Sequence, residues 1–335
     1  MRKLCIIYLL LAAAISSKGQ DIHFSQAFNH PLWQTPAAAG MMQADYRVSA
    51  IYKNQWSSVP VPFNTLLLSG DAVLLKLKNQ DKISAGLLIY SDRAGDSKFS
   101  LYQSELAVSY AKSLGDSLHY LSGGFMFGLA GRSFSTKKLF FDNQFVDGSL
   151  DPSIPIDESF AGTSLSSLDI GAGLMYSFDY KGRARINAGI GAYHLNSPTV
   201  SFYDQDDVKL NNRYHFFISG DILVNASLRL KPTFIFQQQD VKKELLLAAV
   251  MAYKIESFTI PHLVAQAGLM YRNQDALVAY AGLEYNSMQF GLSYDINTSQ
   301  LTSASRGNGG FELSAIYQFY KVQKINSKGA VCPIF

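Results

Sequence analysis

The chain is poor in charge and nearly free of cysteine. Asp, Glu, Lys and Arg make up 16% of its 335 residues, against about 25% in ordinary soluble proteins. The formal net charge of +3 is small and scattered, so nothing in the sequence predicts a nucleic-acid partner. The two cysteines, Cys5 and Cys332, lie near opposite ends. If the stretch around Cys5 is removed, no internal disulfide can form.

Sequence patterns of catalytic and metal sites are also missing. No two of the six histidines have zinc-protease spacing, and no cysteine pair completes a zinc site. There is no P-loop and no G-x-S-x-G elbow. Gly171-Ala172-Gly173 and Gly189-Ile190-Gly191 begin like nucleotide-binding loops but lack the last glycine. We therefore predict a non-enzymatic protein with no catalytic residues, no cofactor and no metal site.

Long apolar runs are absent except at the N-terminus. Residues 4–15 are apolar, follow two basic residues and precede Ser17-Lys18-Gly19, whose small residues suit a cleavage site. The run is too short for a membrane helix, which needs about 20 residues. We predict that residues 1–19 form a signal peptide, that the mature chain begins at Gln20, and that the protein is exported.

Aromatic residues are abundant, and apolar residues alternate with polar ones. The 22 Phe and 19 Tyr residues are typical of a protein with aromatic girdles at two membrane interfaces. In residues 168–179 the even positions, such as Leu168 and Leu174, are mostly large and apolar, whereas odd positions, such as Asp169 and Ser177, are mostly small or polar. A period of two places these sets on opposite faces of a strand. The pattern favours lipid on one face and a polar lumen on the other.

The same alternation predicts about fourteen strands, an even number as in single-chain bacterial barrels. We place them at 45–54, 64–76, 82–91, 99–111, 118–131, 164–179, 183–194, 212–224, 225–237, 243–254, 261–272, 276–286, 287–297 and 308–320. The predicted fold is all-β, a transmembrane antiparallel β-barrel over residues 45–320 with a C-terminal periplasmic tail at 321–335. A soluble sandwich with uneven loops is the alternative.

Two long connections, 132–163 and 195–211, follow odd-numbered strands, as extracellular loops do when both termini are periplasmic. We predict that these outer loops bind a partner, because loops on a rigid wall commonly carry function. The candidate contact residues are Asp142, Asp147, Asp151, Asp157, Glu158, Tyr203 and Asp206. The acidic residues of the first loop do not match the EF-hand pattern, so a solvated acidic loop is favoured over a calcium site.

Residues 20–44 precede the first predicted strand and suit neither helix nor strand. Two prolines fix φ and remove backbone donors. Burying each large apolar residue of the segment is worth about 1.5–3 kcal/mol. We therefore predict a docked plug, at the periplasmic mouth of the lumen or on a partner. The docking residues are Phe24, Phe28, Leu32, Trp33 and Pro36.

Both ends of the sequence resemble one known family. The N-terminal matches are His23-Phe24-Ser25-Gln26, Asn29-His30-Pro31-Leu32, Thr35-Pro36-Ala37-Ala38-Ala39-Gly40, Tyr46-Arg47-Val48 and Tyr52-Lys53-Asn54-Gln55-Trp56. The C-terminal matches are Tyr285-Asn286, Gly291-Leu292-Ser293-Tyr294-Asp295, Gly310-Phe311-Glu312-Leu313 and Cys332-Pro333-Ile334-Phe335. Together they resemble the PorP/SprF family of the type IX secretion and gliding systems. Ile22 and Thr35 stand where that family usually has Pro and Asn.

The resemblance implies a component of the Gram-negative outer membrane that binds, delivers or anchors an exported surface protein or adhesin. The family's clients carry a type IX C-terminal domain, and its members also work with a periplasmic secretion ring. The alternative is an outer-membrane channel for small hydrophobic molecules. Fatty-acid transporter barrels also have about fourteen strands and an N-terminal plug with an Asn-Pro-Ala element, which Thr35-Pro36-Ala37 matches distantly. An outer-membrane lipase or protease is a third, weaker alternative.

Overall fold

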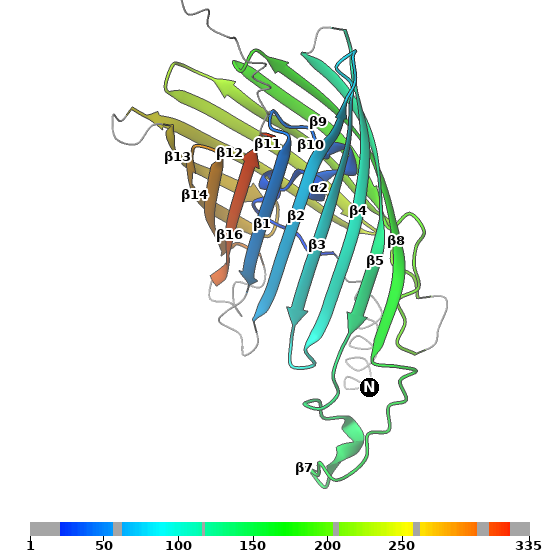
Figure 1. Ribbon diagram of the computed structural model, residues 1–335. Helices are drawn as coiled ribbons and strands as arrows, with labels where there is room; N and C mark the ends of the chain where they lie inside the picture. Colours follow the sequence, from blue (N-terminus) through cyan, green and yellow to red (C-terminus); the bar gives the residue numbers. More distant parts are fainter. Residues whose placement is uncertain are drawn as a thin grey trace, which may run out of the picture.

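The computed structural model describes residues 21–55, 62–115, 118–203, 208–256, 262–299 and 308–321. In this part of the chain, fourteen antiparallel strands close into one barrel (Figure 1). They are β1 (Tyr46–Gln55), β2 (Phe63–Lys76), β3 (Lys82–Ala94), β4 (Phe99–Ser113), β5 (His119–Ser133), β8 (Ser164–Tyr180), β9 (Ala184–Tyr193), β10 (Arg213–Leu223), β11 (Leu228–Gln239), β12 (Lys242–Ile255), β13 (Leu263–Arg272), β14 (Ala276–Tyr285), β15 (Met288–Asn297) and β16 (Asn308–Phe319).

The predicted fold class is confirmed, and each predicted strand overlaps an observed one. The predicted signal peptide and the tail beyond residue 321 lie outside the described residues. Among the described residues, no helix is long and apolar enough to cross a membrane. Two small features of the longest loop were not predicted, the turn η3 (Asp142–Gln144) and the hairpin of β6 (Phe145–Val146) and β7 (Ser149–Leu150) that follows it. Two-residue strands are too short to show alternation.

Pairing of the first and last strands leaves the described barrel without a free edge. Tyr46 of β1 lies opposite Phe319 of β16, and their rings stack at 5.0 Å. The remaining strands each pair with their neighbours in sequence, and β5 pairs with β8 across the longest loop. Closure matters in a membrane because lipid offers no hydrogen bonds to an exposed strand edge.

The two ends of the barrel differ. The long connections between β5 and β8 and between β9 and β10 lie at one end, which we call the outer end. The chain enters β1 and leaves β16 at the other end, which we call the inner end; short turns such as Lys181-Gly182 lie there. Long loops outside and short turns inside are the rule for bacterial outer-membrane barrels.

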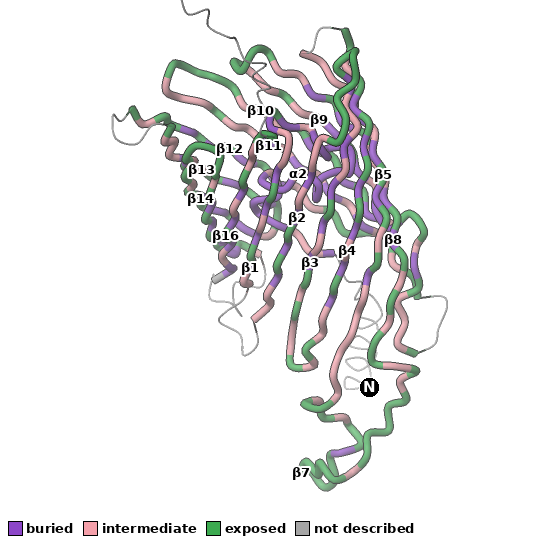
Figure 2. The backbone as a smooth tube through the Cα atoms, in the orientation of Figure 1, coloured by how far each residue is buried: buried purple, intermediate pink, exposed green. Residues whose placement is uncertain are grey.

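Alternation sets the two faces of the wall, as the sequence predicts. In β8, Leu168 and Leu174 are 65% and 53% exposed, whereas Asp169 and Met175 are buried. Buried positions recur on alternate residues through most strands (Figure 2). Because side chains of a strand alternate between its faces, the exposed apolar set faces lipid and the buried set faces the lumen.

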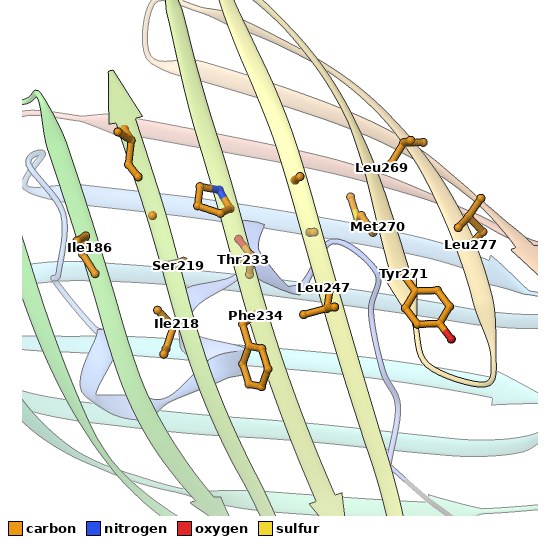
Figure 3. A pocket seen from close by; sticks show the side chains of 15 residues that line it. Ile186, Ile218, Ser219, Thr233, Phe234, Leu247, Leu269, Met270, Tyr271 and Leu277 are labelled. Carbon is orange, nitrogen blue, oxygen red and sulfur yellow. The ribbon is translucent and has the colours of Figure 1, made fainter. Parts of the chain in front are cut away.

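The lipid-facing wall carries an apolar groove of about 580 Å³ across β9 to β14. Phe234, Leu247 and Tyr271 stand out from its strands (Figure 3). Its floor includes Gly220 and Pro232, and the β10–β11 ladder has no register pair at these two residues. Proline has no N–H to give to the ladder, so the β10–β11 pairing is interrupted there.

The lumen is filled by the N-terminal segment, residues 21–44 (Figure 1). It forms three short turns, η1 (Ala27–Asn29), α2 (Pro31–Gln34) and η2 (Pro36–Ala38). Pro31 and Pro36 each begin a turn, where proline's fixed φ is suited and its missing donor is not needed. Each proline keeps its turn from extending toward the N-terminus, so the segment consists of short turns.

The segment runs along the height of the lumen rather than resting only at the inner mouth. At the outer end, the backbone N–H of Asp21 donates to Gln239 at the end of β11, at 2.8 Å. At the inner end, Lys82 at the start of β3 donates to the carbonyl of Met42, at 3.4 Å. The predicted position was the inner mouth or a partner; the depth of the segment depends on long-range contacts that the sequence pattern does not show.

We expect Leu174→Arg to prevent barrel assembly. Leu174 faces lipid, and a cation near the lipid midplane costs about 2–4 kcal/mol. Ser177→Arg is the matched control, because Ser177 lines a hollow at the inner mouth. Heat-modifiable migration on gels measures the folded fraction. Normal assembly of Leu174→Arg with failure of Ser177→Arg would mean that the faces are reversed.

Candidate functional site

Glycines in the wall leave room for the segment to lie close against the strands. A Cβ added to Gly124 of β5 would lie 2.6 Å from the backbone N of Ala37. One added to Gly173 of β8 would lie 2.0 Å from Thr35 Oγ1. A side chain at either position would therefore clash with the segment, which explains glycine where another part of the chain approaches the strand this closely.

An aromatic cluster holds the outer half of the segment. Trp33 packs edge-on against Phe24 at 5.4 Å and against Tyr90 of β3 at 5.5 Å. The guanidinium of Arg213 lies over the rings of Trp33 and Tyr193, 4.3 Å from each centroid. Such cation–π contacts strengthen when water is excluded, and these residues are buried.

The structure brings the five predicted docking residues into the lumen. Phe24, Leu32, Trp33 and Pro36 are buried. Phe28 is half-buried, with its ring 5.7 Å from Tyr280. The carbonyls of the segment are also bonded by the wall. Tyr193 donates to Trp33 O at 3.0 Å, Ser122 to Ala37 O at 2.8 Å and Ser109 to Ala39 O at 2.9 Å.

One acidic site binds the segment's backbone directly. The carboxylate of Glu312 in β16 accepts the N–H groups of Ser25 and Gln26, at 2.8 and 2.9 Å. Ser25 Oγ donates to Asp295 at 2.8 Å, and Arg272 pairs with that same carboxylate at 2.6 Å. Charge-assisted bonds of this kind are stronger than neutral ones, and every partner is buried.

A second ionic cluster closes over the segment's first described residue. His194, just after β9, lies between Asp21 and Asp169, at 2.5 and 2.7 Å. Burial alone would lower the pKa of His194, but the two carboxylates outweigh it and raise that pKa to about 9. Burial and the Arg47 charge lower the pKa of His30 in the segment to about 3. His194 is thus a cation and His30 is neutral.

The outer loops hold the predicted acidic residues apart from the lumen. The five acidic side chains of the first loop are exposed: Asp142, Asp147, Asp151, Asp157 and Glu158. No group of three potential ligands for a metal ion is found among the described residues. Tyr203 is 49% exposed, and its ring lies 5.1 Å from Phe160. Asp206 lies outside the described residues.

Sequence reasoning missed the wall residues that bind the segment. Arg272, His194 and Arg213 lie far from the segment in sequence. One sequence alone does not show which distant residues will contact each other in the fold. Asp295 and Glu312 did carry a signal. Both stand in C-terminal motifs of the family resemblance, and both bind Ser25 in the N-terminal motif.

Comparison with known proteins identifies the family of this chain. The model of the family described as type IX secretion system membrane protein PorP/SprF matches residues 16–317. The chain belongs to the PorP/SprF family. No curated protein matches it. As a PorP/SprF member with this fold, it is a non-enzymatic outer-membrane β-barrel.

Solved structures show the same barrel at low sequence identity. The toluene transporter TbuX of Ralstonia pickettii is 10% identical, with a TM-score of 0.53 over 87% of this chain and 94% of TbuX. A Pseudomonas aeruginosa FadL homologue is 11% identical, with a TM-score of 0.52 over 87% of this chain and 95% of its own. At such identities the likeness concerns the fold alone.

We expect Gly124→Ala to block docking of the segment. Its Cβ would meet the backbone of Pro36 and Ala37 at 2.6 Å, and overpacking costs about 1–3 kcal/mol. Undocking should raise protease cleavage within residues 21–44 and single-channel conductance in planar bilayers. Gly123→Ala is the control, because its Cβ would meet only the Leu174 side chain at 3.5 Å. A folded Gly124→Ala barrel with a protected segment and unchanged conductance would contradict this docking.

Docking should be most stable near pH 6.5. The docked pKa of His194, about 9, lies above the ordinary 6.5, so its stabilisation is full below pH 6.5 and is lost as pH rises through 9. The docked pKa of His30, about 3, lies below 6.5, so docking weakens as pH falls from 6.5 toward 3. Fluorescence of Trp33, with Trp56→Phe to remove the second signal, reports docking.

The His194→Gln variant separates the two effects. Glutamine keeps hydrogen-bonding groups but does not titrate, so the alkaline decline should disappear while the acidic decline remains. An unchanged alkaline decline would show that another group controls it.

Proposed function

We propose that this PorP/SprF barrel holds or delivers an exported surface protein at its outer face and contacts periplasmic secretion-ring components at its inner face. Membership of the family supports the choice of these partners, including a client with a type IX C-terminal domain. The binding of a client at the outer face is supported by the ordered structure of the β5–β8 loop.

This loop has internal structure despite its length, and it projects beyond the barrel (Figure 1). Asp147 and Gly148 both have positive φ and form the turn between β6 and β7, as a two-residue hairpin requires. Beneath it, Gln144 is buried and donates to Ile154 O at 2.8 Å. Asn143 donates to Pro155 O at 2.7 Å. A pre-ordered loop loses little entropy when a partner binds.

Aromatic rings fix the base of the loop to its neighbour. Phe134 packs edge-on against Phe160 at 5.0 Å and against Phe202 of the β9–β10 connection at 4.8 Å. The backbone of Ala161 also donates to Phe202 O at 2.9 Å. The two loops that the sequence predicts to bind a partner are thereby joined into one surface.

The exposed chemistry of this surface suits a protein partner. Its exposed apolar residues are Phe140, Phe145, Val146, Leu150 and Ile156, and its acidic residues surround them in sequence. Exposed apolar and acidic side chains on one loop favour a protein contact, in which apolar groups exclude water and charged groups set specificity.

The channel alternative has less support. TbuX is described as a toluene transporter, but the shared fold does not carry that activity to this chain. Here the segment fills the lumen, and the hollow beside Phe28, Arg47 and Phe217 measures about 210 Å³. Transport would therefore need the segment to move. Liposome uptake of a hydrophobic tracer by the unaltered protein would favour the channel.

We expect Val146→Asp to weaken client binding about tenfold or more. Val146 is 49% exposed on the hairpin, and losing one apolar contact of its size costs about 1.5–3 kcal/mol. Client recovered with the barrel from solubilised outer membrane and client on the cell surface are both measured. Val241→Asp is the matched control, since Val241 is 71% exposed in the β11–β12 turn. Equal loss in both variants, or in neither, would contradict the proposal.

A further inference from the structure

Two hollows meet at the inner mouth of the barrel. One of about 210 Å³ and one of about 380 Å³ are both lined by Met41 and Met42 of the segment and by Arg185 of β9. We call them together the inner vestibule. The segment supplies Met41 and Met42 together with the amides of Asn29, Gln34 and Gln43, and the walls carry Lys82, Lys181 and Lys231 as well as Asp179 and Asp221.

The inner end of the barrel is strongly cationic. We count described residues in its connections, in the chain's entry and exit, and within three residues of a strand end. They include twelve Lys and Arg residues against six Asp and Glu residues, and Arg47 is neutralised by Asp71, directly opposite it on β2, which leaves a net charge of +5. The cations are Arg47, Lys76, Lys78, Lys82, Lys112, Lys181, Arg183, Arg185, Arg229, Lys231, Lys254 and Lys321. The acids are Asp45, Asp81, Asp179, Asp221, Glu256 and Glu284.

Most of these acids already have a positive partner. Asp45 pairs with Lys76 at 2.6 Å, Asp179 with Arg185 at 2.6 Å and Asp221 with Arg229 at 2.6 Å. Glu284 lies 3.9 Å from Lys231. The remaining excess includes the exposed side chains of Lys78, Lys112, Lys181, Arg183, Lys254 and Lys321.

We propose that the inner vestibule binds an acidic segment of a second, periplasmic protein, with apolar side chains of that segment against Met41 and Met42. This rests on the proposed function in one respect, that the inner end faces secretion-ring components. Electrostatic complementarity steers and selects such a partner. Methionine side chains adapt to varied apolar shapes, and Met41 is only half-buried.

Two other occupants fit less well. The chain's own tail, residues 321–335, contains three lysines and no acidic residue, so the cationic mouth repels it. Anionic lipid headgroups surround a barrel from outside. Arg185 and Lys231, however, line the hollow inside the wall, out of reach of a headgroup in the bilayer.

The test uses the full-length mature protein in detergent and a fluorescein-labelled peptide of alternating Glu and Leu. Fluorescence anisotropy should show binding that weakens with added NaCl. The double variant Lys181→Glu, Arg183→Glu should bind about tenfold more weakly. The matched control Lys137→Glu, Lys138→Glu reverses two cations of the outer loop and should bind normally. A peptide of alternating Gln and Leu should not bind.

Cross-linking locates the peptide. A photo-reactive residue in place of Met41 should label it, and one in place of Phe145 should not. Equal binding of the Gln peptide, or equal loss in both double variants, would overturn the proposal. So would competition only by phosphatidylglycerol vesicles, or binding that appears only after removal of residues 322–335. Client display through the outer loop is measured separately, so either proposal can fail alone.

Discussion

The lumen of this barrel must satisfy the hydrogen bonds of an irregular segment that satisfies few of its own. Three short turns leave many N–H and C=O groups without partners inside the segment, and a buried unpaired group costs about 1–3 kcal/mol. Wall side chains meet this need. Glu312 accepts two backbone N–H groups, and Ser109 and Ser122 donate to backbone carbonyls. The polar lumenal face is therefore a template for one particular segment.

The same requirement explains the charged groups that the lumen buries. Arg272 lies between Asp275 and Asp295 at 2.5 and 2.6 Å, and Arg47 pairs with Asp71 at 2.8 Å. A buried ion pair does not by itself add much stability, because both charges lose water. Here the carboxylates of Asp295 and Asp71 also bind Ser25 and Gly40 of the segment. The wall cations orient these carboxylates toward the segment, so the pairs serve specificity.

The sequence was sufficient for the wall and insufficient for the lumen. Strand alternation is local and follows from burial on one face, so β8 and its neighbours could be placed from their residues alone. The large apolar residues Phe24 and Trp33 predicted burial of the segment because water excludes them. Its depth depends on contacts such as Asp21 with His194, which join residues far apart in sequence. Glu312 was visible only as a motif residue, and its role as a backbone acceptor required the fold.

The docked segment also connects the two surfaces on which function is proposed. Its first described residue lies in the ionic cluster at the outer end, and Met41 and Met42 line the inner vestibule. Between them, the segment's backbone lies against Gly124 of β5 and accepts hydrogen bonds from Ser109 and Ser122, so it cannot slide without breaking those bonds. A partner that displaces the methionines would therefore act on the element whose other end lies beside the outer loops. Any movement of the segment would also have to break or shift the bonds that the wall makes to it, such as those of Ser109 and Ser122.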